Sequence, residues 1–188
     1  MVHVMAHLTA SVEYGIHSLL WLAGAGEAPM SSRELAEFQG LPPAFLAKIF
    51  AKLEKAGIVE ASEGVRGGYR LARAPQDISF LDIVDAIEGR KPLFECQEVR
   101  GRCAVFGDCP PDWATNGTCS IHAVILRAEK AMREALAERS LADVGRAVER
   151  KAPPEFASEV RSWIDDRVSR RVRKSMPVAS SASEETSQ

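Results

Sequence analysis

Two short helical segments separated by a tight turn restrict most strongly what this chain can fold into. Ser31, Ser32 and Glu34 together indicate a helix start, because a serine hydroxyl accepts free backbone N–H groups and the carboxylate suits the positive end of the helix dipole. They predict a helix over residues 32–38 that ends at Gly40. A second helix is expected from Pro43, since proline is tolerated in a first turn, up to Gly57.

A glycine-rich hairpin is predicted directly after the second helix. Residues 58–61 and 69–73 have the composition of two strands, and residues 63–68 between them form a tight turn. Two short helices followed by such a hairpin are together typical of a winged helix-turn-helix. We therefore predict a mainly α-helical fold with a small β-wing.

The pattern also names the residues that this fold would present to double-stranded DNA. The second helix of a winged helix enters the major groove with its N-terminal residues, and lysines on its exposed side meet phosphates. A glycine-flanked arginine at the wing tip suits a minor groove or a phosphate. The predicted DNA-binding residues are Ser32, Pro43, Ala44, Lys48, Lys52, Arg66 and Tyr69. Alternatively, the lysines form a solvated face and the domain binds protein.

Composition and periodicity divide the chain into five segments. These are a winged helix-turn-helix domain (1–90), a cysteine-rich loop (91–119), a dimerisation helix (120–150), a basic amphipathic helix (151–174) and a disordered tail (175–188). The apolar stripe from Ile121 to Leu136 indicates dimerisation, because it is too long for one small domain to cover alone. The basic helix is expected to pack its Trp163 face on the dimer and to add phosphate contacts.

Bulk properties exclude several classes of function. The formal net charge of −2 gives no general support for nucleic-acid binding, so that prediction depends on local residues. With no run of about 20 uncharged apolar residues and no signal-peptide pattern, we expect a cytoplasmic protein that does not span a membrane. No nucleotide loop or nucleophile-base pair is recognisable, so we expect neither an enzyme nor a small-molecule substrate.

All four cysteines, Cys96, Cys103, Cys109 and Cys119, lie in one short segment. Soft sulfur ligands can hold a metal ion, an iron-sulfur cluster or disulfides, and a reducing compartment disfavours disulfides. Four thiolates suit structural zinc, although no pair has the short C-x2-C spacing. Glu13 and His17, four apart on a helix expected over residues 9–24, share one face and could bind one object or form an exposed ion pair.

Five segments together resemble the bacterial iron-sulfur transcription regulators that include IscR and the nitric-oxide-sensing repressor NsrR. They are residues 8–13, 35–46, 53–59, 66–72 and 78–84, and the resemblance extends over about residues 8–150. It implies a homodimer that binds a two-fold symmetric operator. It also implies a cluster between the cysteine loop of one subunit and the first helix of the other.

The resemblance implies two possible ligand sets for that cluster. The family's three-cysteine pattern corresponds to Cys103, Cys109 and Cys119, and His122 lies where IscR has its histidine ligand. Residues 12–17 and 94–100 are instead similar to RsrR, a relative with a 2Fe-2S cluster, which implies Glu13, His17, Cys109 and Cys119. The mixed set is favoured because ligands from both subunits would couple the cluster to their packing. We therefore expect 2Fe-2S rather than 4Fe-4S.

The expected function is a transcription regulator, with repression the favoured direction, that senses redox state, nitric oxide or iron-sulfur status. One alternative is a winged-helix regulator with structural zinc or no metal. A less favoured alternative is an iron-sulfur electron carrier, in which a complete winged helix would have no use. The residues leave open the signal, the operator sequence and whether Cys96 takes part.

Overall fold

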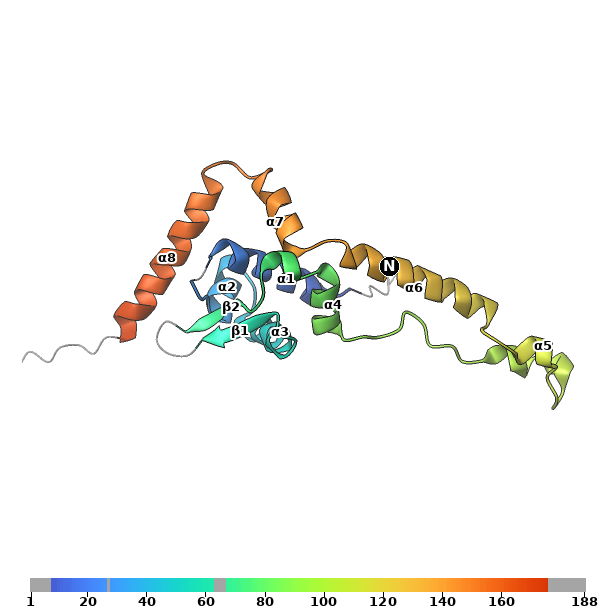
Figure 1. The fold of residues 1–188 in the computed structure, drawn as a ribbon. Helices are drawn as coiled ribbons and strands as arrows, with labels where there is room; N and C mark the ends of the chain where they lie inside the picture. Colours follow the sequence, from blue (N-terminus) through green and yellow to red (C-terminus); the bar gives the residue numbers. More distant parts are fainter. Residues whose placement is uncertain (1–7, 27, 63–66, 176–188) are drawn as a thin grey trace, which may run out of the picture.

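The computed structural model describes residues 8–26, 28–62 and 67–175, which form a helical body with two extensions (Figure 1). The helices are α1 (Ala10–Gly24), α2 (Ser32–Gln39), α3 (Pro43–Lys55), α4 (Phe80–Glu88), α5 (Asp112–Thr115), α6 (Ser120–Ala137), α7 (Leu141–Glu149) and α8 (Phe156–Ser175). Strands β1 (Val59–Ser62) and β2 (Gly68–Leu71) form an antiparallel sheet, and short 3-10 turns occupy Pro75–Asp77, Val99–Arg102 and Ala104–Phe106. The predicted mainly α-helical fold with a small β-wing is confirmed.

Helices α2 and α3 form the predicted helix-turn-helix, and the local sequence determines their ends. Ser31 Oγ accepts the N–H of Glu34, while Glu34 Oε2 accepts the N–H of Ser31 at 2.8 Å, which completes a capping box. Helix α2 ends at Gly40, whose φ of 67° lies in the left-handed region that glycine favours. Pro43 occupies the first turn of α3, where the absence of its N–H breaks no helical hydrogen bond.

The wing is fastened to the body by a backbone bridge that the sequence pattern did not predict. Strands β1 and β2 pair in register, with Val59 opposite Leu71 and Ser62 opposite Gly68. Beyond this sheet, Met30 and Tyr69 exchange backbone hydrogen bonds of 3.0 and 2.8 Å. The bridge joins β2 to the segment just before α2. The expected wing tip, including Arg66, lies outside the described residues.

Gly68 is required at the bridge because two backbone segments approach closely there. A Cβ at this position would lie 2.8 Å from the carbonyl carbon of Met30 and 2.9 Å from its oxygen. Backbone atoms cannot rotate aside, so we expect Gly68→Ala to lower the free energy of unfolding by about 1–3 kcal/mol. Gly24→Ala is the control, since its Cβ would meet nothing within 4 Å. Urea denaturation measures both, and equal stability of the two variants would contradict this role of Gly68.

The core lies where α1 crosses α3 and α4. Leu19, Leu46 and Phe50 are fully buried there. Gly15 lets the helices approach, because a Cβ on it would lie 2.5 Å from Cδ1 of Ile87. Thr9, which caps α1, donates its hydroxyl to Glu88 Oε1 at 2.5 Å. These contacts fix α1 in the body and leave its outer face free for other partners.

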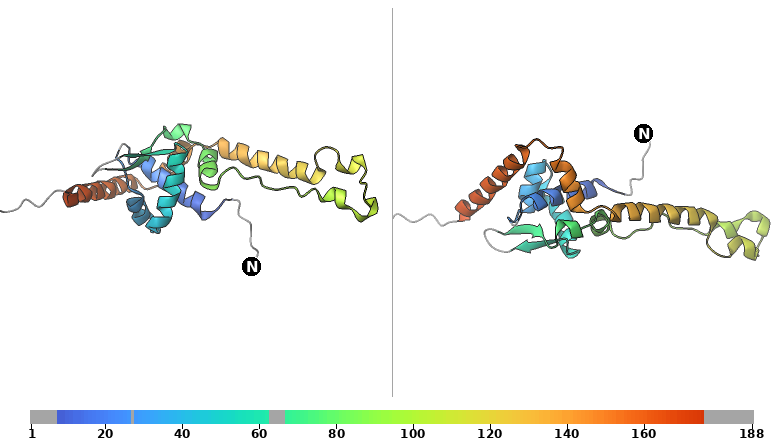
Figure 2. Two further views of the ribbon diagram at one scale, coloured as in Figure 1. Left: turned by 90° about the horizontal axis from the view of Figure 1, so that it is seen from below. Right: turned by 45° about the horizontal axis from the view of Figure 1, so that its top comes forward.

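Helix α6 and the cysteine loop form an arm that projects from the body in every view (Figures 1 and 2). Every residue of α6 is described, and none is buried. Ile121 and Val124 are 68% and 56% exposed. At the base of the arm, Arg133 donates hydrogen bonds of 2.9 and 2.8 Å to the two carboxylate oxygens of Asp85 on α4. This bidentate pair attaches the arm to the body.

The Asp85 pair predicts a pH dependence of stability. Hydrogen bonds from Arg133, and secondarily from Arg90, hold the pKa of Asp85 below its ordinary value of 3.8. A lowered folded-state pKa means that the pair stabilises fully above the unfolded pKa and is lost as the pH falls through the lower, folded value. We expect Asp85→Asn to cost about 1–2 kcal/mol at neutral pH, and the cost to shrink at acidic pH. Urea titrations at both pH values measure it, and a pH-independent cost would contradict the assignment.

Helices α7 and α8 return from the arm to the body. The N–H of Phe80 donates to the carbonyl of Arg139, and the N–H of Leu141 donates to that of Ile78. Helix α8 buries Val160 and Ile164. The Trp163 ring lies 4.8 Å from that of Phe38 on α2, so within one chain the Trp163 face packs on the helix-turn-helix, while its packing in a dimer stays a prediction. The expected tail beyond residue 175 lies outside the described residues.

Candidate functional site

Helix α3 presents an exposed face opposite its buried stripe, as predicted for a recognition helix. Pro43, Ala44 and Lys48 are exposed, while Leu46 and Ile49 face the core. Because the α3 N-terminus follows the turn directly, the first two of these residues lie where a winged helix meets base edges. Their contact with DNA stays a prediction.

The other predicted DNA-binding residues differ in how free their side chains are. Lys52 is exposed, but its Nζ donates to the carbonyl of Ile87 at 2.6 Å and so stabilises the C-terminal end of α4. The Tyr69 ring packs on Phe50 with centroids 4.8 Å apart, and burial, followed by the charge of Glu54, raises the pKa of its hydroxyl. Ser32 is half-buried in the first turn of α2. Among the predicted DNA-binding residues that the structure describes, exposed Lys48 therefore has the charged side chain that is most available to bind a phosphate.

The cysteine loop is ordered by one arginine that the sequence analysis did not single out. Arg100 donates to the carbonyls of Asn116 and Gly117 at 3.3 and 2.7 Å, and to Glu98 Oε2 at 2.9 Å. These bonds close the loop on itself just before α6. Arg100 and Arg102 both lie among the four cysteines, and two of the acceptors of Arg100 are backbone carbonyls, so no signal in the sequence singled out Arg100.

Cys119 lies at the N-cap of α6, as expected. The backbone N–H of His122, and then that of Ile121, lower the pKa of its thiol. A thiolate is the form that binds metal, and the N-terminus of a helix favours negative charge. Of the four cysteines, Cys119 is therefore the one whose surroundings most favour the thiolate that binds metal. His122 lies three residues further on, and its ring contacts that of Phe94 at 5.7 Å.

The other three cysteines are free thiols along the same arm. Cys103 and Cys109 are exposed, and Cys96 is half-buried, with its thiol 3.5 Å from Glu98 Oε1. Exposed apolar side chains surround them, including Val105 at 84% and Trp113 at 78% exposure. Apolar residues at the end of a projecting arm indicate a surface that is covered in the functional assembly.

Glu13 and His17 lie on the exposed face of α1, one turn apart. They line a hollow of about 620 Å³ whose other lining residues include Val12, Ile16, Val84, Leu136 and Val148. Figure 1 shows helix α1 well separated from α5 at the tip of the arm. Within the described residues, no three His, Cys, Asp or Glu side chains gather to hold a metal ion. One chain therefore does not bring the predicted ligands together.

The chemistry of these groups nevertheless fits an iron-sulfur cluster. Thiolates are the usual ligands of such clusters, and imidazole replaces thiolate in some of them. The arm supplies a prepared thiol in Cys119, while α1 supplies an exposed carboxylate and imidazole on one face. The body and the arm thus each carry half of the predicted ligand set.

Comparisons with known proteins bear on the family and the fold of the chain. The family model described as "Rrf2: Iron-dependent Transcriptional regulator" matches residues 8–147. Protein rrf2 of Nitratidesulfovibrio vulgaris is 36% identical over 103 residues, which cover 54% of this chain and 69% of that protein. The structure of T. potens IscR has 28% identity and a TM-score of 0.58, covering 78% of this chain and 90% of that one.

The structure of CymR, the global cysteine regulator of B. subtilis, has the same fold. It is 24% identical, with a TM-score of 0.59 over 74% of this chain and 96% of that one. Among the described helices, none is long and apolar enough to cross a membrane. The helix-turn-helix, the wing and the projecting helix, together with the family match over residues 8–147, show that this chain belongs to the Rrf2 family of winged-helix transcriptional regulators.

Proposed function

We propose that this chain is a homodimeric repressor that binds a two-fold symmetric DNA operator and senses redox state, nitric oxide or iron-sulfur status through a 2Fe-2S cluster. The observation that carries the proposal is the division of candidate ligands between the body and a projecting arm. Cys119 lies at the N-terminus of an arm helix that has no buried residue, and Glu13 and His17 lie on the body. A second subunit is needed to unite them.

Dimerisation through α6 supports the proposal on energetic grounds. The apolar side chains of this helix, which include Ile121 and Val124, remain in contact with water in one chain. Burying such a side chain contributes about 1.5–3 kcal/mol. A two-fold axis perpendicular to the arm would pair the two α6 helices antiparallel, cover the stripe and carry the tip of each arm towards the body of the other subunit.

Four side chains would hold the cluster: Cys109 and Cys119 from one subunit, and Glu13 and His17 from the other. Cys103 is the alternative third thiolate, with Cys96 as a bystander. When bound, the cluster would supply a one-electron change of charge at the subunit boundary. The chain's part is to present a thiolate at the α6 N-terminus and a carboxylate and imidazole on α1.

The position of α1 explains how such a site could affect DNA binding. Helix α1 packs on both α3 and α4, and Gly15 lies in close contact with Ile49 of α3 and Ile87 of α4. A force on Glu13 or His17 therefore acts on the helix that supports the recognition helix. Each oxidation state of the cluster would stabilise a different arrangement of the two subunits. A change of oxidation state would then shift the dimer between its DNA-bound and free forms.

Purification without oxygen tests the proposal. The protein should be coloured and should contain about two iron atoms and two acid-labile sulfides per subunit, the stoichiometry of one 2Fe-2S cluster. A colourless protein with stoichiometric zinc would contradict the sensor and support a zinc-stabilised DNA-binding module. Tight, salt-sensitive and sequence-selective binding to the promoter of its own gene would distinguish a regulator from an electron carrier.

A further inference from the structure

Helix α8 lies beyond residues 8–147, the part of the chain that matches the family model, yet it packs on the DNA-binding half of the body. Its first half anchors it: Val160 and Ile164 are buried, and Trp163 contacts Phe38 of α2. Arg167 then pairs with Glu37 of α2 at 2.6 Å and lies over the Trp163 ring. These contacts direct the C-terminal end of α8 along α2 towards the wing (Figure 1).

Arg171 connects that end of α8 to three parts of the DNA-binding unit. Its guanidinium donates to the carbonyl of Gly67 in the wing and to that of Pro29 at 3.0 Å. Its Nε pairs with Glu34 Oε1 at 3.0 Å. The other carboxylate oxygen of Glu34 serves the capping box of α2. Arg171 therefore neutralises a buried carboxylate and holds the wing against the start of α2.

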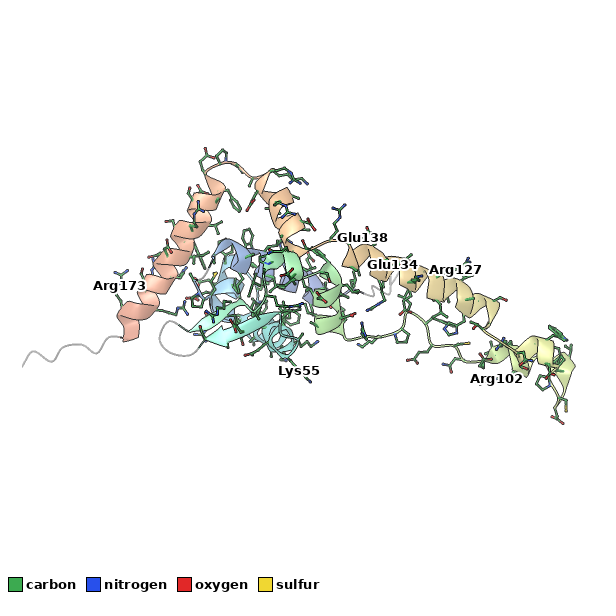
Figure 3. All side chains as sticks on the ribbon, in the orientation of Figure 1. Lys55, Arg102, Arg127, Glu134, Glu138 and Arg173 are labelled. Carbon is green, nitrogen blue, oxygen red and sulfur yellow. The ribbon has the colours of Figure 1, made fainter. Side chains whose placement is uncertain are left out.

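Two further arginines are exposed at the same end of α8 as Arg171. Arg170 and Arg173 are both exposed, and Figure 3 shows Arg173 projecting from the end of α8. Arg170 pairs with Asp166 at 2.8 Å, but this is a surface pair of two largely exposed side chains, which contributes little and can be exchanged for a stronger partner. Arg170 and Arg173 belong to the same last turns of α8 as Arg171, whose bond to the wing backbone fixes the position of this helix end.

We propose that the C-terminal end of α8 is an additional DNA contact, in which Arg170 and Arg173 bind backbone phosphates next to the site of the wing. The proposal rests on DNA binding by α3 and the wing, as proposed above. Charge complementarity selects the partner: the chain as a whole is slightly acidic, with a formal net charge of −2, whereas this end of α8 is locally basic. Arginine suits phosphate because its planar guanidinium donates two parallel hydrogen bonds.

The alternative is that these arginines only complement the negative end of the helix dipole and keep the surface soluble. That role explains cations in the last turn, but it does not require the helix to be fixed to the wing. Two hydrogen bonds from Arg171, to the carbonyls of Gly67 and Pro29, and its ion pair with Glu34 do fix it there. A basic helix end whose position relative to the wing is fixed is pre-organised for a phosphate.

The test compares the full-length chain with two variants of equal charge. Arg170→Gln/Arg173→Gln removes the proposed contacts. Arg150→Gln/Arg161→Gln removes two arginines of the same exposure from the end of α7 and the first half of α8, with Arg161 about 18 Å along the helix from Arg173. Binding is measured from 50 to 200 mM salt on a duplex carrying the gene's own promoter and on an unrelated duplex of equal length.

We expect Arg170→Gln/Arg173→Gln to reduce the slope of log affinity against log salt by about 0.9 for each phosphate that is no longer neutralised, and to weaken binding to both duplexes about tenfold or more. The matched variant should keep the slope of the unaltered protein, and thermal unfolding should be the same for all three. Unchanged slopes, or equal weakening in both variants, would overturn the proposal. If the unaltered protein binds neither duplex, the proposed function itself fails and this inference fails with it.

Discussion

Cys119→Ala is expected to reduce the bound iron and acid-labile sulfide at least tenfold, the largest loss from any single cysteine. The backbone N–H groups of His122 and Ile121 at the start of α6 lower the pKa of its thiol and favour the thiolate that binds metal. Its position is also fixed by a helix, whereas Cys103 and Cys109 lie in exposed turns. Without this fixed ligand, the remaining ligands should no longer be held in the positions that bind the cluster.

The matched control is Cys96→Ala, because that thiol contacts Glu98 and is the least favoured ligand. We expect it to retain the iron and sulfide content of the unaltered protein, with Cys109→Ala between the two. Iron and sulfide quantitation with visible absorbance, after purification without oxygen, measures the series. If Cys119→Ala held as much iron as the unaltered protein, Cys119 would not be a ligand.

Val124→Asp is expected to convert the dimer to monomers and to weaken operator binding more than 100-fold. Val124 is 56% exposed on α6 and belongs to the stripe that begins with Ile121. In a dimer through this stripe, the new carboxylate would be buried without a partner, which costs several kcal/mol. A monomer then contacts only one half-site, so it binds without the contribution of the second.

Lys130→Ala is the control for Val124→Asp. Lys130 lies on the same helix, and its side chain is 76% exposed and makes only a 3.7 Å pair with Glu134. Sedimentation velocity should show a dimer for the control and a monomer for Val124→Asp, with similar helix content in both. A dimeric Val124→Asp protein would rule out α6 as the subunit interface.

Features that depend on neighbouring residues could be predicted from the sequence. Ser31 with Glu34, and Ser79 with Asp82, form capping boxes, so the starts of α2 and α4 follow from residues three apart. Cys119 lies at the start of α6 because an apolar periodic stretch begins directly after it. The fold class follows from such local signals placed in order.

Contacts between distant segments could not be predicted in the same way. The bridge between Met30 and Tyr69 joins backbone groups, which any residue supplies. Lys52 appeared free for phosphate, yet it caps α4 through the carbonyl of Ile87, 35 residues away. Trp163 has the same helical spacing whether it faces a partner or its own α2. In each case the tertiary arrangement, rather than the local pattern, decides the contact.

A mixed dimer tests most directly the central claim that each site takes ligands from both subunits. Two differently tagged subunits are co-purified, one with Cys109→Ala/Cys119→Ala and the other with Glu13→Ala/His17→Ala. If each site takes ligands from both subunits, this dimer keeps one complete set of ligands and about half the iron. A dimer with all four substitutions on one subunit then keeps no complete set and no iron. The reverse result, none in the first and half in the second, would show that each subunit holds its cluster alone and would contradict the account.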